Sequence, residues 1–224
     1  KVDATEFIPH KFVVTSAFSA ERKEKTIVNT IGTVDYLIEK YEQQIVKLTH
    51  LSDLIFMAYL NSSHLENLTL GKCTKIKTGK LNADAAVTNG KYRFFTCGQD
   101  ELFINDYAFD CKVIIVSGNG EISCRFYQGK FNAYQRTYVL EPTNYFYLFL
   151  KQCEFSIENL KNDSQGSVIK FITKGMLENI TIPINNLSNE INRKIENIYQ
   201  LIFAKRKQID ILKKNKKILL QKYF

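Results

Sequence analysis

Apolar residues recur with alternating steps of four and three near the N-terminus of the chain. They occupy Ile27, Ile31, Val34, Ile38, Tyr41, Ile45, Leu48 and Ile55, and Ser52 is the one polar gap. Between Ser19 and Leu60 there is no proline and a single glycine. A heptad spacing sustained over about four repeats is typical of a helix packed along another helix. We therefore predict a long helix over residues 19–62, with Ser19 as its N-cap and residues 1–18 as a tail.

The C-terminal end has the same heptad spacing. Its apolar positions after Pro183 are Ile191, Ile195, Ile198, Ile202, Ile209, Leu212 and Leu219. We predict a second long helix over residues 187–224. The two helices are expected to pair antiparallel, because the ends of a compact middle domain can lie close together and parallel pairing would need a long crossover. Lys205 and Lys216 fill two places in the seam, and we expect this end to face another molecule.

The residues between the two helices have a different pattern. Short runs typical of strands cover residues 74–77, 92–95, 113–116, 122–127, 137–140, 168–172 and 180–184, with glycines between them. Residues 144–159 have instead the spacing of a helix. The sequence therefore predicts an α+β fold, in which a mainly-β domain over residues 63–186 is flanked by two long helices forming an antiparallel coiled coil.

Several classes of protein are excluded by composition and motifs. No apolar stretch approaches the ~20 residues that a membrane-spanning helix needs, and the five cysteines form no C-x-x-C pair. We expect reduced cysteines in a cytoplasmic protein. There is no phosphate-binding loop, nucleophile elbow or zinc-binding helix, and the three prolines are isolated, which excludes the Asn/Asp-Pro-Pro-aromatic loop of adenine methyltransferases. We predict a non-catalytic chain with no metal and no cofactor.

The positive charge is concentrated at the C-terminus. Eight basic residues and one acid lie between Lys205 and Lys222, so this segment contributes +7 to a formal net charge of +8. A segment of this kind can meet phosphates, a membrane surface or an acidic protein, and composition does not choose among them.

Predicted loops of the middle domain place basic and amide side chains beside aromatic residues. Lysine and arginine neutralise phosphates, and arginine and glutamine can read base edges in the major groove. Each such cluster alone is more often a solvated face, but several on one small domain favour binding to nucleic acid. The candidate residues are Lys77, Lys80, Lys91, Arg93, Arg125, Lys130, Gln135 and Arg136.

The order of these segments resembles half of a DNA-specificity subunit of a Type I restriction-modification system. The matching stretches are Leu70–Lys72 with Ile76–Lys80, Ser117–Gly120 with Gly129–Asn132, Gly166–Ile184, Leu212–Phe224 and, in the first helix, Ile31–Lys40. The chain departs from the family at the entrance to the second helix, where Asn185-Asn186 and Asn189-Glu190 replace a second proline and a Glu-Gln pair. Full subunits of the family carry two recognition domains, and this sequence carries one, so it is either a natural half-subunit or a fragment of a longer subunit.

The resemblance implies a mechanism in which the β-rich target recognition domain grips one half of a bipartite site in duplex DNA. It also implies that modification subunits, which methylate adenine, dock on the helices, and that a restriction subunit can join them. A chain with one recognition domain is expected to form a homodimer. Two alternatives remain open at this stage: a coiled-coil adaptor whose β domain binds protein, and an RNA-binding module with aromatic stacking platforms.

Overall fold

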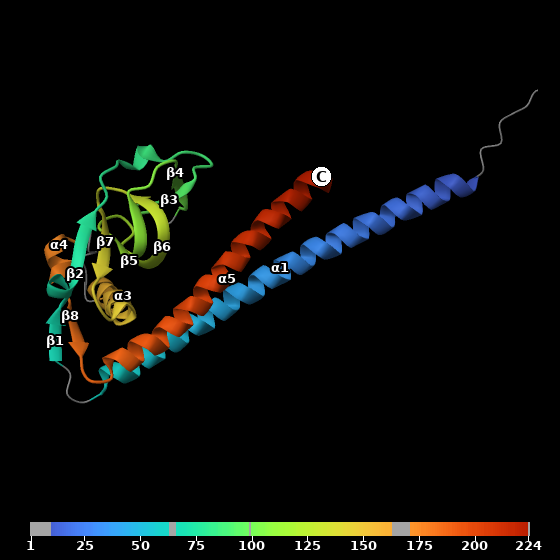
Figure 1. Ribbon diagram of the computed structural model, residues 1–224. Coiled ribbons are helices and arrows are strands. Elements are labelled where there is room, and N and C mark those ends of the chain that lie inside the picture. The colour runs from blue at the N-terminus through green and yellow to red at the C-terminus, as the bar shows by residue number, and fades with distance from the viewer. Residues whose placement is uncertain (1–9, 63–65, 99, 163–170, 224) are drawn as a thin grey trace, which may run out of the picture. The chain divides into compact units, whose positions relative to one another are not determined.

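The computed structural model describes residues 10–62, 66–98, 100–162 and 171–223 (Figure 1). The chain divides into two compact units. The helical unit comprises the described parts of Lys1–His50 and Tyr199–Phe224, and the β unit comprises those of Leu51–Ile198. The helices are α1 (His10–Leu60), α2 (Leu70–Cys73), η1 (Ala83–Ala85), α3 (Phe146–Asn162), α4 (Lys174–Glu178) and α5 (Ser188–Tyr223). The strands are β1 (Glu66–Thr69), β2 (Thr74–Thr78), β3 (Tyr92–Phe95), β4 (Leu102–Ile104), β5 (Phe109–Ser117), β6 (Cys124–Ala133), β7 (Thr137–Pro142) and β8 (Thr181–Ile184).

The helical unit is an antiparallel pair formed by α1 and α5. Lys205 of α5 donates to Gln44 (2.6 Å), Lys213 pairs with Glu42 (3.5 Å), and Lys216 pairs with Asp35 (2.6 Å). Successive contacts along α5 therefore meet earlier residues of α1. The predicted antiparallel coiled coil is confirmed. Among the described side chains of this unit, the buried ones belong to the predicted seam or its continuation: Ile38, Tyr199, Ile202 and Ile209.

One detail of the predicted helices is corrected. The first helix begins at His10 rather than at Ser19, because residues 10–18 contain no proline or glycine that would stop it. Lys205 and Lys216 have partners within the hairpin: Lys205 bonds to Gln44 and its ammonium lies 5.2 Å from the centroid of the Tyr41 ring, and Lys216 pairs with Asp35. A lysine stem can lie along an apolar seam while its ammonium reaches a polar group at the edge. That this end of α5 also faces another molecule stays a prediction.

The β unit is built on a six-stranded sheet with the order β2-β7-β5-β6-β3-β4. All neighbours pair antiparallel except β3 and β6, which are parallel. One face carries a buried cluster formed by Val113, Ile115, Phe131, Ala133 and Val139. The opposite face packs on α3, where the rings of Phe126 and Phe146 lie 5.8 Å apart. Buried side chains therefore lie on both faces of the sheet.

A second, two-stranded sheet lies where the chain enters and leaves the β unit. Strands β1 and β8 pair antiparallel over Glu66–Thr69 and Thr181–Ile184. Next to it, Tyr59 near the end of α1 donates to the carbonyl oxygen of Pro183 (2.9 Å) and lies 2.7 Å from Ser188 Oγ at the start of α5. These contacts join the last turn of α1 to the first turn of α5.

Candidate nucleic-acid interface

The turn between β6 and β7 is the most firmly held loop that carries predicted site residues. We call Tyr134, Gln135 and Arg136 the hairpin tip. The Tyr134 amide donates to the carbonyl of Phe95 (2.8 Å), and the Gln135 amide donates to that of Leu81 (2.9 Å). The carbonyl of Arg136 accepts from the Gly118 amide (2.8 Å). Backbone bonds from three separate segments thus fix the tip.

The side chains of the tip remain available for an external ligand. Gln135 and Arg136 are exposed, and so is Lys80, which precedes the segment that pairs with the tip. Within the part of the chain that the structure describes, no hydrogen bond or ion pair engages these three side chains. The tip therefore presents an amide and a guanidinium on a rigid backbone, with an ammonium beside them.

Three other predicted residues share one face of the sheet. The register places Lys77 opposite Val139, Arg125 opposite Ile115, and Arg93 opposite Phe131, all of which belong to the buried cluster of that face. Residues directly opposite each other in neighbouring strands point to the same side of a sheet. Lys77, Arg93 and Arg125 therefore line the face away from α3.

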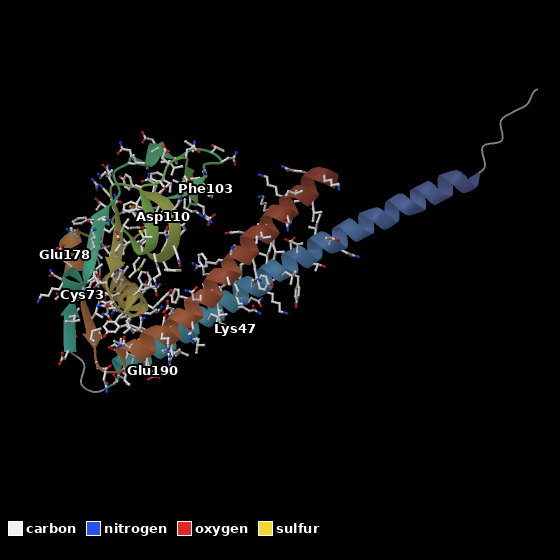
Figure 2. The ribbon with its side chains drawn as sticks, viewed as in Figure 1. Lys47, Cys73, Phe103, Asp110, Glu178 and Glu190 are labelled. Atoms are coloured by element: carbon white, nitrogen blue, oxygen red, sulfur yellow. The ribbon has the colours of Figure 1, made fainter. Side chains whose placement is uncertain are left out.

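These three cations already have partners in the chain. Lys77 pairs with Glu141 (2.8 Å), and this hydrogen bond raises the pKa of Lys77. Arg93 pairs with Glu101 (2.5 Å) and its guanidinium lies 5.2 Å from the ring centroid of Phe103, which is labelled in Figure 2.

Arg125 braces the loop beside the hairpin tip. It donates to the carbonyl of Gly98 (3.0 Å) and to Ser123 Oγ (3.2 Å). Cys97 precedes Gly98 in that loop, and its sulfur lies 3.5 Å from the carbonyl oxygen of Arg136. Arg125 therefore supports one side of the tip through this loop.

The last two predicted residues, Lys91 and Lys130, belong to a cluster with two tyrosines. Lys91 lies 5.3 Å from the ring centroid of Tyr92, Lys130 lies 4.5 Å from that of Tyr107, and the two rings are 5.0 Å apart. A side-chain hydrogen bond with Tyr107 raises the pKa of Lys130. We call these four residues the tyrosine–lysine cluster.

The tyrosines of this cluster were missed by sequence reasoning. Tyr92 follows Lys91 directly and could have been included on that ground, but Tyr107 meets Lys130 only because the loop after β4 folds back on β6. Asp110, labelled in Figure 2, lies opposite Lys130 in the register of β5 and β6. A carboxylate therefore offsets part of the positive charge here.

The eight predicted residues thus fall into three groups with different surroundings. The described residues contain no group of three or more His, Cys, Asp or Glu side chains placed to hold a metal ion. No helix in the described part of the chain is long and apolar enough to cross a membrane. What the surface offers is hydrogen-bond donors and positive charge.

The comparison with solved structures found similar chains. An S subunit of a Type I restriction-modification system from M. genitalium is 19% identical, with a TM-score of 0.71, over 91% of this chain and 61% of that one. An HsdS subunit from Thermoanaerobacter tengcongensis is 14% identical, with a TM-score of 0.49, over 90% of this chain and 57% of that one. At 19% identity the first likeness supports the fold alone.

The family is established by the sequence itself. The family model for the Type I restriction modification DNA specificity domain matches residues 63–221, and the chain belongs to this family. The specificity subunit of the Type I restriction enzyme EcoDI from Escherichia coli is 40% identical over 129 residues, which cover 56% of this chain and 28% of that protein. The resemblance expected from the sequence is confirmed.

Proposed function

We propose that the β unit binds duplex DNA sequence-specifically and recognises one half of a bipartite target site. The observation that carries the proposal is the hairpin tip, where Gln135 and Arg136 are exposed and have no side-chain hydrogen bond or ion pair with the described residues, on a backbone fixed by its neighbours. Amide and guanidinium groups are the ones that read base edges in the major groove. Membership of the DNA specificity domain family supports the same role.

In this proposal the chain performs no chemistry of its own. It directs the modification subunits of a Type I system, and the restriction subunit where one is present, to the DNA that it has bound. Adenine methylation and cleavage then belong to those subunits. Membership of the DNA specificity domain family supports this division.

A ligand panel tests the proposal. We expect the chain to bind duplex DNA more tightly than single-stranded DNA or duplex RNA of the same length in a fluorescence anisotropy titration. Binding to RNA alone would indicate an RNA-binding module. Binding to none of the three would favour a protein-binding adaptor and contradict the proposal.

Alanine at all eight predicted residues is expected to weaken duplex binding by about tenfold or more near ~0.1 M salt, because it removes seven positive charges that attract phosphates. The matched control carries alanine at Lys174 and Lys194, two exposed lysines of the β unit outside the three groups, and should bind like the wild type. Circular dichroism establishes that both variants are folded. Equal affinity of the eightfold variant and the wild type would place the recognition surface elsewhere.

We further propose that two copies associate, so that two recognition domains meet the two halves of a bipartite site. A twofold dimer would present two equivalent half-sites and should prefer a palindromic target. Light scattering at micromolar concentration, with and without the segment after Ile209, tests this. We expect a dimer for the whole chain, and a monomer that binds a single half-site would contradict the proposal.

A further inference from the structure

The hairpin tip differs from the other basic groups of the β unit in how closely neighbouring backbone surrounds it. A Cβ atom added at Gly79 would lie 1.9 Å from the carbonyl oxygen of Ala133, directly before the tip. One added at Gly118 would lie 2.5 Å from the carbonyl oxygen of Arg136. Only glycine allows the backbone at these two positions to come so close, so the loops that contain Gly79 and Gly118 pack directly against the backbone of the hairpin.

Among the described residues, the hydrogen bonds of the tip engage its backbone, and none engages the side chains of Gln135 and Arg136. The amide of Gln135 and the carbonyl of Arg136 are both used within the chain, and the amide of Thr137 donates to the carbonyl of Tyr134 (2.8 Å), which closes the turn. Rigid backbone with free side chains suits groups that must meet a partner at fixed positions, because base readout needs placement to a fraction of an ångström.

The remaining predicted cations are arranged differently. Lys77 and Arg93 pair with Glu141 and Glu101, and Lys91 and Lys130 are point charges beside tyrosine rings. An ammonium has no planar fork and attracts phosphate without reading sequence. Among the eight residues, Arg136 is the guanidinium with no partner in the described part of the chain.

We propose, on the basis of the proposed function, that Arg136 and Gln135 are the base-reading pair of this domain, and that Lys91 and Lys130 contact the phosphate backbone. Arginine offers two parallel donors to the O6 and N7 atoms of guanine, and glutamine matches the N6 and N7 atoms of adenine. The two residues are adjacent in the turn, so they address neighbouring positions of the half-site. The tip thus carries the specificity, and the tyrosine–lysine cluster carries affinity that does not depend on sequence.

The test begins with selection of preferred duplexes from a random pool by the wild-type chain. Arg136→Lys keeps the charge and loses the fork, so discrimination at one base pair should fall by about 5- to 100-fold while the other positions stay selected. Gln135→Ala should relax a neighbouring position in the same way. Lys130→Ala should weaken all duplexes alike and reduce the slope of log affinity against log salt by about 1.

The possible results distinguish base reading by Arg136 and Gln135 from duplex DNA binding by the β unit. If Arg136→Lys and Gln135→Ala select the same sequence as the wild type with the same discrimination, the tip does not read bases and the inference is wrong. A wild-type chain that binds duplex DNA without any preferred sequence overturns the inference but leaves DNA binding standing. A wild-type chain that binds no duplex at all overturns the proposed function as well.

Discussion

Ile202→Asp is expected to destabilise the helical unit by several kcal/mol, because it places a carboxylate in the seam between α1 and α5. Ile202 is 2% exposed, and the same change at Ile38, which is 9% exposed, should act in the same direction. A charge moved from water to an apolar contact loses its hydration without gaining a partner. Thermal melting followed by circular dichroism at the helical band should show a marked fall in Tm.

The matched controls lie on the outer faces of the same helices. Leu201 is 53% exposed and Tyr36 is 60% exposed, so Leu201→Asp and Tyr36→Asp change helix propensity in a similar way without burying a charge. These controls should melt close to the wild type. Melting of Ile202→Asp at the same temperature as Leu201→Asp would mean that the seam is not a packed interface.

The second large effect is expected at a buried lysine of the β unit. Lys151 of α3 is 4% exposed and forms ion pairs with Asp53 of α1 and Glu154 of α3. Burial lowers the pKa of Lys151, but the two carboxylates together raise it above its usual value. Lys151 therefore stays charged at neutral pH, and the stability that follows from its raised pKa is lost as the pH rises through that pKa.

Removal of both carboxylates by Asp53→Asn with Glu154→Gln should cost about 3–5 kcal/mol, because it leaves a buried ammonium without a counterion. Adding Lys151→Met to that variant should recover much of the loss, since a methionine has no charge to solvate. Denaturant unfolding measures both changes.

An exposed pair provides the control for this experiment. Glu190 and Lys194 lie 2.6 Å apart with side chains about half exposed, and Glu190→Gln should change the free energy of unfolding only slightly, because solvent screens the pair. If the variant lacking Asp53 and Glu154 carboxylates unfolds like Glu190→Gln, Lys151 is solvated and the buried network does not stabilise the unit.

The long helices could be predicted because their signal is local and repeated. Heptad spacing places every third or fourth side chain on one side of a helix whatever the rest of the chain does, and the antiparallel pairing followed from the compact domain between them. The bounds were harder to predict. Residues 10–18 have no heptad spacing that would mark them as helical, although they contain no residue that breaks a helix. Lys205 and Lys216 fit in the seam because Gln44 and Asp35 of α1 lie opposite them, and the heptad pattern of α5 alone does not show this.

The surroundings of the candidate residues could be predicted only in part. Residue type and loop position predicted exposed side chains at Gln135, Arg136 and Lys80, and the structure places all three at the surface. Their role in binding stays a prediction. Whether a cation is free or already paired depends on contacts between strands, which local sequence does not contain: Glu141 reaches Lys77 across β2 and β7. The approach of Tyr107 to Lys130 has the same origin.

The predicted basic residues differ in whether they have a partner within the chain. Lys77 and Arg93 pair with carboxylates of the same domain, whereas the Gln135 and Arg136 side chains have no hydrogen-bond or ion-pair partner among the described residues. We therefore propose that the tip is the part that meets a ligand. Backbone hydrogen bonds to Phe95, Leu81 and Gly118 hold the tip in one conformation.

The central claim is that the β unit binds duplex DNA through these basic and amide groups, and the salt dependence of duplex affinity tests it most directly. Between about 50 and 200 mM salt, log affinity of the wild type should fall linearly with log salt, because phosphate contacts release counterions. The eightfold alanine variant should bind more weakly with a clearly shallower slope. Equal slopes for the two proteins, or duplex binding that does not change with salt, would contradict the account.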